Sequence, residues 1–170
     1  MRYNAKGEIV LKKNRPLIGL IAAEAEYIFF ASALHEVQRE LFAADMDAAI
    51  FSSLMMSGNS EFDAAENSVY DLINLDMLDG IIIFPSSISD VPTREKLISR
   101  IKSDFRGPVV SIDSEVEGFT NCLYDYQPAA EMIVSHVMDV HGAKTLDFVG
   151  GPQDDFHDSI QHYFLEAMSK

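Results

Sequence analysis

The chain has 170 residues, of which 48% are hydrophobic, and its 27 acidic against 13 basic residues give a formal net charge of -14. This length and apolar content are sufficient for one domain with a real core, or for one lobe and part of another. The negative charge opposes contact with nucleic-acid phosphates and with anionic membranes, so we expect this segment to bind neither.

The first residues differ in character from the rest of the chain. Basic side chains crowd residues 1–14, which we assign to a basic linker or arm, because a short run of this kind is typical of a solvated segment. The opening residues lack the apolar core of a signal peptide, and no apolar run approaches the ~20 residues that span a bilayer. Cys122 is the only cysteine, which excludes an internal disulfide. These features predict a cytoplasmic protein.

From residue 16 onward, short apolar runs alternate with segments of helical periodicity. The runs that we predict to be strands are 16–22, 47–52, 79–85, 107–113, the short piece 120–125, and 145–152. This alternation predicts an α/β domain built on a Rossmann-like, doubly wound and mainly parallel sheet.

The helices between these strands are predicted from apolar residues that recur on one face. The first helix has Phe30, Leu34, Val37 and Leu41 on this face. The second, with Ser60 as its N-cap, has Phe62, Ala65, Val69, Leu72 and Ile73. The third has Leu97, Ile98, Ile101 and Phe105, and the fourth has Ala130, Ile133, Val134, Val137 and Met138. A last helix is predicted to begin at Asp158.

Four polar loops leave the carboxyl ends of predicted strands. They are residues 23–30, 85–87, 113–115 and 151–156. Right-handed crossovers bring the carboxyl ends of parallel strands to the same edge of a sheet, which is where ligands bind in open α/β folds. We therefore expect these loops to line one cleft.

A series of segments resembles a known family. In chain order the segments are IGLIAAEAEYIFFASAL, LDGIIIFPSS, GPVVSID, LYDYQPAAEMIVSHVMDVHGAKTLDFVGGP and YFLEAM. They resemble the ligand-sensing domain of LacI-type (lactose repressor) transcription regulators and its sugar-binding periplasmic relatives. The resemblance implies a type I periplasmic-binding-protein fold, in which two Rossmann-like lobes close on a small molecule. It implies that 15–123 form the N-terminal lobe and that 124–170 begin an incomplete C-terminal lobe.

The resemblance also implies a binding site. The aromatic pair of the first loop matches the family pattern, although the Asn-Pro that usually precedes it is absent, and Gln161 stands where the family has an arginine. Phe30 shares the core face with Leu34, which leaves Tyr27 and Phe29 to stack on a ligand ring. The residues that we predict to bind the ligand are Tyr27, Phe29, Ser86, Ser87, Asp113, Asp125, Asp155, Phe156 and Gln161.

The remaining acidic residues and the histidines can be interpreted without assigning them to a metal or catalytic site. Glu24 and Glu26 are either solvated loop charges or cleft carboxylates that favour a polyhydroxyl or cationic ligand. The histidines are scattered, offer no ligand-spaced pair and are interpreted as surface or packing residues: His35, His136, His141, His157 and His162. We expect neither a metal site nor a cofactor, because no carboxylate spacing resembles a calcium loop.

The resemblance implies a ligand-binding sensor, which we expect not to be an enzyme and whose ligand is sugar-like or nucleoside-like. The resemblance also implies an output domain. Residues 1–14 are too few for the DNA-binding domain that precedes the sensor in repressors of this family, so the resemblance leads us to expect an AraC-type, GGDEF-type or histidine kinase domain beyond residue 170. Self-association as a homo-oligomer, commonly a dimer, is a further expectation. The alternatives are a Rossmann-like enzyme acting on a nucleoside or sugar phosphate, which needs a phosphate loop or a catalytic pair, and a receiver-like domain, which needs an aspartate where Phe84 ends the third strand.

Overall fold

The structure is a computed structural model that forms two compact units, Met1–Cys122 and Leu123–Lys170. It describes residues 2–3, 9–10, 15–25, 27–54, 65–151 and 155–169, with the side chains of 15–25, 27–54, 65–151 and 157–169. Within the first unit, β1 (Arg2–Tyr3) and β2 (Ile9–Val10) pair antiparallel, separately from the main sheet.

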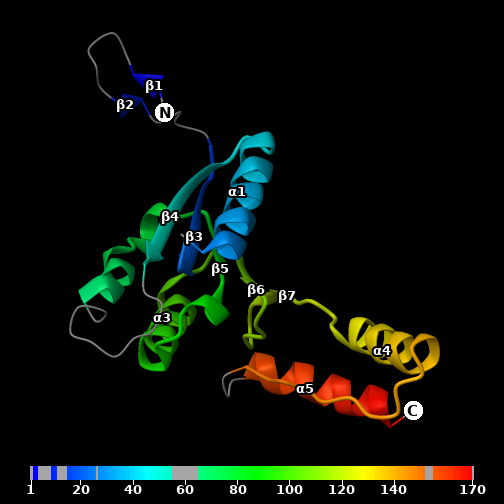
Figure 1. Cartoon of the computed structure of the whole chain (residues 1–170). Helices are drawn as coiled ribbons and strands as arrows, with labels where there is room; N and C mark the ends of the chain where they lie inside the picture. Colours follow the sequence, from blue (N-terminus) through cyan, green and yellow to red (C-terminus); the bar gives the residue numbers. More distant parts are fainter. Residues whose placement is uncertain are drawn as a thin grey trace. The chain divides into compact units, whose positions relative to one another are not determined.

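The first unit contains a five-stranded sheet in which all neighbouring strands run parallel (Figure 1). Its strands are β3 (Leu17–Ala23), β4 (Asp47–Ser53), β5 (Gly80–Ile83), β6 (Val109–Ile112) and β7 (Thr120–Cys122), in the order β4-β3-β5-β6-β7. Strand β3 is buried along almost its whole length, because it has a neighbour on each side and its residues enter the cores on both faces of the sheet. The predicted parallel α/β fold class is confirmed.

Helices cover both faces of this sheet and close two cores. On one face, α1 (Ile28–Ala43) packs all four of its predicted apolar residues against a cluster that contains Leu20 and Phe84. On the other face, α3 (Val91–Asp104) buries Leu97 and Ile101 in a cluster with Ile21 and Ile83. The helical periodicity of both segments is therefore confirmed. In the described part of the chain, no helix combines the length and the apolar content needed to cross a membrane.

The second predicted helix is wrong in type, and its predicted buried face is confirmed only for Ile73, which is buried, and Val69, which packs against the core. Residues 65–66 are helical and lead into the 3-10 helix η1 (Asn67–Leu72), while Ser60 and Phe62 lie outside the described residues. A 3-10 helix repeats every three residues, and Asn67, Tyr70 and Ile73 are accordingly all buried. Leu72, which the α-helical period placed inside, is 77% exposed.

The second unit is built from helices. Helix α4 (Gln127–Ser135) continues directly into a single π turn, η4 (His136–Val140), and α5 (Asp155–Met168) begins three residues before the predicted start. The predicted strand at 145–152 is wrong, since residues 145–151 form no regular structure. A strand needs a neighbour to share its ladder hydrogen bonds, and this unit contains no described strand to pair with. Of the residues predicted for the buried face of α4, Val134 is buried as expected, whereas Ile133 is 60% exposed.

Candidate functional site

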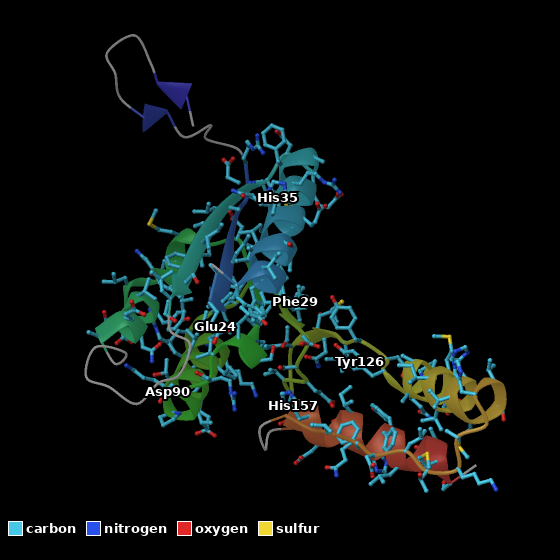
Figure 2. The ribbon with its side chains drawn as sticks, viewed as in Figure 1. Glu24, Phe29, His35, Asp90, Tyr126 and His157 are labelled. Carbon is cyan, nitrogen blue, oxygen red and sulfur yellow. The ribbon has the colours of Figure 1, made fainter. Side chains whose placement is uncertain are left out.

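The candidate site lies where the order of the sheet changes direction. From β3 the chain crosses to β4 on one side and then returns to β5 on the other side. In doubly wound sheets, the carboxyl ends of the two strands at such a switch point form the place where ligands bind. Figure 2 labels Glu24 and Phe29 close to this point, where β3 ends and α1 begins.

Two non-glycine residues at this edge have a left-handed backbone. Glu24, directly after β3, has a φ of 54°, and Asp113, directly after β6, has a φ of 62°. Their conformations are held by backbone hydrogen bonds: Glu24 N–H donates to the Ser53 carbonyl (2.8 Å), and Asp113 N–H donates to the Cys122 carbonyl (3.0 Å). Such strained positions are costly for residues with a side chain, and they concentrate at functional sites. Partial burial also raises the pKa of the Glu24 carboxyl above its ordinary value.

Exposed aromatic rings stand at the start of α1. Tyr27 is 52% exposed and Phe29 is 45% exposed, whereas Phe30 packs against the core. The Phe30 ring makes edge-on contacts with Phe29 at 5.2 Å and with Phe84 at 6.2 Å between ring centres. The predicted division between an inward Phe30 and an outward Phe29 is confirmed, and the outward rings form a surface on which a flat or ring-shaped ligand can stack.

The two serines after β5 differ in their hydrogen bonding. The Ser87 hydroxyl is buried, donates to the Phe84 carbonyl (2.7 Å) and accepts from the Ala23 N–H (2.8 Å). It therefore ties the end of β3 to the turn η3 (Pro85–Ser87). The Ser86 Oγ atom is also buried, but it has no hydrogen-bond partner among the described residues. Of the two hydroxyls, Ser86 is thus the one whose hydrogen-bonding capacity the described residues leave unused.

Tyr70 supports this edge, although the sequence analysis did not single it out as a site residue. Its buried hydroxyl donates to the Ala22 carbonyl (2.9 Å) and lies 3.1 Å from the Ser53 Oγ, at the carboxyl ends of β3 and β4. Burial raises the pKa of this hydroxyl, and hydrogen bonds with Ser53 oppose the increase. The three-residue spacing of Asn67, Tyr70 and Ile73 was the sequence signal that could have identified Tyr70 as buried.

The predicted site residues are distributed over both units. The sheet edge of the first unit carries Tyr27, Phe29, Ser86, Ser87 and Asp113. Asp125 and Gln161 belong to the second unit, where the Asp125 carboxylate accepts the Gln127 N–H (3.1 Å) in the turn that starts α4 and Gln161 is exposed on α5. The side chains of Asp155 and Phe156 lie outside the described residues.

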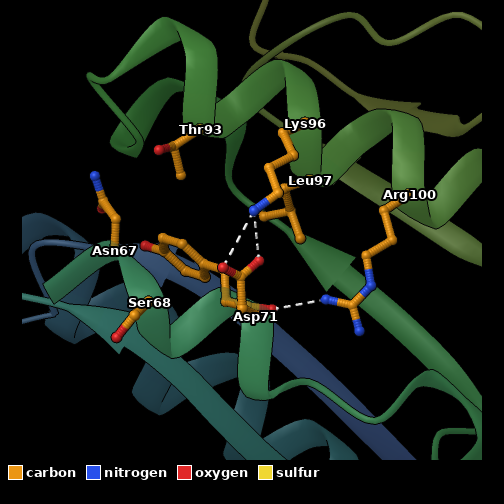
Figure 3. A pocket seen from close by; sticks show the side chains of 8 residues that line it. Asn67, Ser68, Asp71, Thr93, Lys96, Leu97 and Arg100 are labelled. Carbon is orange, nitrogen blue, oxygen red and sulfur yellow. Dashed lines mark hydrogen bonds and ion pairs between the residues drawn. The ribbon is translucent and has the colours of Figure 1, made fainter. Parts of the chain in front are cut away.

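A separate cavity of about 170 Å³ lies between η1 and α3 (Figure 3). It is lined by Asn67, Ser68, Tyr70, Asp71, Thr93, Lys96, Leu97 and Arg100. The hydrogen bond from Lys96 to Asp71 (2.9 Å), together with the lysine charge, lowers the pKa of Asp71. Arg100 donates to the carbonyls of Tyr70 and Ile73. Because these cations are paired within the protein, we interpret the cavity as part of the contact between α3 and η1.

Comparison with known proteins finds similar structures but no similar sequence. No family model and no curated protein matches the chain. The fold is similar to that of a sugar-binding LacI-family transcriptional regulator from Enterococcus faecalis, with a TM-score of 0.61 and 17% identity over 94% of this chain and 53% of that chain. A LacI regulator from Lactobacillus casei gives 0.61 and 20% identity over 95% of this chain and 55% of that chain.

The fold is also similar to that of a solute-binding protein. An ABC transporter solute-binding protein from Clostridium phytofermentans, with bound β-D-glucose, gives a TM-score of 0.66 and 11% identity over 90% of this chain and 48% of that chain. The fold is thus the one shared by LacI-type regulators and periplasmic binding proteins, as the segments of the sequence predicted. The chain spans about half the length of these structures.

Proposed function

We propose that this chain is part of a small-molecule sensor domain of a bacterial transcription regulator or signal-transduction protein, and that it binds a sugar or nucleoside-like ligand without catalysing a reaction. The observation that carries the proposal is the placement of two exposed aromatic rings and an unpaired, buried serine hydroxyl at the switch point of the sheet. The similar structures support it, because they are named as sugar-binding regulators and a solute-binding protein.

The chemistry of this edge suits a neutral polyhydroxyl molecule. A sugar ring has an apolar face that can stack on Tyr27 or Phe29, and its hydroxyls can pair with Ser86 and with a carboxylate such as Asp113. The acidic groups of the loops disfavour an anionic ligand. Gln161 stands where the family has an arginine, and its amide can donate and accept individual hydrogen bonds but lacks the paired, charged donors of a guanidinium group. We therefore expect a ligand that does not need such a bidentate, charged donor.

The domain organisation is part of the same proposal. Residues 15–123 would form the first lobe, and 124–170 would begin a second lobe that contributes Asp125, Asp155, Phe156 and Gln161. Ligand binding would favour the closed arrangement of the lobes and so bias an output domain located beyond residue 170. Self-association would occur between copies of the complete protein.

The test is a binding experiment with a matched control. The chain and the full-length gene product are titrated calorimetrically with a panel of neutral sugars and nucleosides. For the compound that binds, we expect Tyr27→Ala and Phe29→Ala each to weaken binding roughly tenfold, the effect of losing about 1.4 kcal/mol of stacking. Ile28→Ala is the control, because Ile28 is 79% exposed on the same turn and is not a predicted site residue. Equal affinity for the wild type and both aromatic variants would contradict the site.

A further inference from the structure

Two histidines meet at the end of α4. His136 and His141 are five residues apart, and on an α-helix this spacing would place them about 140° apart around the axis. The sequence analysis found no ligand-spaced pair among the histidines, whereas the structure brings these two imidazoles together. The helix widens into the π turn η4 (His136–Val140), whose i→i+5 hydrogen-bond period brings positions 136 and 141 next to each other. Their Nε2 atoms are 3.2 Å apart.

We propose that His136 and His141 form a binding site for a late first-row transition-metal dication such as Zn²⁺, Ni²⁺ or Cu²⁺. An ion at the usual zinc–imidazole distance of about 2.0–2.1 Å from each nitrogen would see them at an N–metal–N angle of roughly 100°, given their 3.2 Å separation. This angle lies between the square-planar and tetrahedral values. The ring centres are 4.9 Å apart, farther than the Nε2 atoms, so these nitrogens lie on the facing sides of the rings.

The apposed nitrogens can also share a proton, with one neutral ring donating its Nε2–H to the other. Metal binding then needs only a tautomer change in the donor ring: its proton moves from Nε2 to Nδ1, and both Nε2 lone pairs face the ion. No net proton is released and no group becomes charged in this step. Both histidines are exposed, so a hydrated ion can reach them and the transferred proton can be hydrogen-bonded by water.

The number and type of ligands set the class of metal. The described residues contain no group of three or more histidine, cysteine or acidic side chains that could hold a metal ion, so this site supplies two imidazoles and water completes the coordination. Imidazole suits zinc, nickel and copper, whereas calcium and magnesium prefer oxygen ligands. The expected order of affinity places Cu²⁺ above Ni²⁺ and Zn²⁺. The bound ion would link His136, the first residue of the π turn, to His141, the residue that follows the turn.

The experiment uses the full chain without a polyhistidine tag. Isothermal titration with ZnCl₂ and NiCl₂ is expected to give one ion per chain, and His136→Ala and His141→Ala are each expected to weaken binding at least tenfold. His35→Ala is the matched control, since His35 is exposed on α1 and should leave binding unchanged. With Cu²⁺, electron paramagnetic resonance should show coupling to two nitrogens in the wild type and to fewer in each single variant.

Two outcomes would overturn the proposal. One is the absence of binding at ion concentrations of several hundred micromolar, with the circular dichroism of the chain showing that α4 and α5 are folded. The other is equal binding by the wild type and the double variant His136→Ala/His141→Ala. Neither outcome depends on a sugar ligand, so the metal site and the proposed sensor function can fail separately.

Discussion

Glu24 combines two unfavourable features in one residue. Its backbone is left-handed, with a φ of 54°, and its carboxyl is partly buried in a loop at the candidate site. Neither feature is needed to end a strand, since a glycine or asparagine would adopt this backbone at lower cost. The loop is instead held in place by the Glu24–Ser53 backbone bond and by the bond from the Tyr27 N–H to the Glu24 carbonyl. These bonds fix the position of Tyr27, the first residue of the aromatic surface.

The raised pKa of Glu24 predicts a pH effect on stability. The folded protein binds the Glu24 proton more tightly than the unfolded chain does, whose value is near 4.5. The protonated carboxyl therefore stabilises the fold, and this contribution is lost as the pH rises through the folded pKa. Relative to the wild type, Glu24→Gln should gain stability between about pH 4 and pH 7. Urea unfolding at several pH values in this range measures the free energy of unfolding of both proteins. A difference between them that does not change with pH would contradict the prediction.

Tyr70 offers a test of the support beneath the site. Removal of its hydroxyl in Tyr70→Phe leaves the Ala22 carbonyl and the Ser53 hydroxyl without this partner in a buried place. We expect the free energy of unfolding to fall by about 1–3 kcal/mol. Tyr124→Phe is the control, because Tyr124 is 55% exposed and should change stability little. Denaturant unfolding monitored by circular dichroism compares the two, and equal stability of both variants would show that the hydroxyl contributes nothing.

Among the elements, α3 shows most clearly how local sequence defines a boundary. Asp90 is its N-cap and accepts the Thr93 N–H (2.9 Å), and Pro92 follows within the first turn, where its missing N–H costs nothing. The hydrogen bonds from Thr93 lower the pKa of Asp90. This cap sets the start of the helix whose Leu97 and Ile101 close the larger core.

The cap of α3 predicts a graded pair of variants. Asp90→Ala should reduce the free energy of unfolding by about 1 kcal/mol. Asp90→Asn should cause a much smaller reduction, because the amide oxygen of asparagine can accept the hydrogen bond from the Thr93 N–H. The lowered folded pKa means that the contribution of the carboxylate is present at neutral pH and is lost as the pH falls through that value. The difference in free energy of unfolding between the wild type and Asp90→Asn should therefore become smaller in strong acid. Alanine and asparagine variants of equal stability at pH 7 would contradict the capping role.

Over the whole molecule, the buried core is divided unequally between the two units. Of the buried hydrophobic residues in the described part of the chain, Val134 alone belongs to the unit Leu123–Lys170. Its helices leave large apolar side chains such as Met132, Ile133 and Leu165 exposed. A unit with so little buried apolar surface has little stability of its own, because hydrophobic burial supplies most of the favourable free energy.

This imbalance predicts unequal protection of the two units. Amide hydrogens of α4 and α5 should exchange much faster than those of β3, β5 and α3 in hydrogen-exchange mass spectrometry. Chymotrypsin should cleave early within residues 123–126, where Leu123 and Tyr124 are exposed in an irregular segment, and release a resistant fragment that contains the sheet. Uniform exchange along the chain would contradict the prediction.

The sequence by itself determined the class of fold and most of its elements. The apolar runs at 16–22 and 79–85 and the apolar faces of α1 and α3 were recognisable because each pattern reflects burial against the nearest layer of the sheet. The same local reasoning separated the core ring of Phe30 from the exposed ring of Phe29. It also located the loops at 23–30, 85–87 and 113–115, since parallel strands place such loops at the carboxyl edge in any order of strands. The loop predicted at 151–156 is not one of them, because residues 145–151 form no strand for it to follow.

Other features depended on contacts between residues distant in sequence. The order β4-β3-β5, which defines the switch point, and the bonds of Ser87 and Tyr70 that join separate strands exist only after the sheet has assembled. Residues 145–151 have the composition of a strand, but a strand forms only where a partner can share its hydrogen bonds. His136 and His141 meet because one turn of the helix changes its hydrogen-bond period from i→i+4 to i→i+5, a change of winding that residue spacing does not reveal. Local periodicity in the sequence indicates which residues are buried. The pairing of strands and the winding of a helix depend instead on contacts that form only when the whole chain has folded.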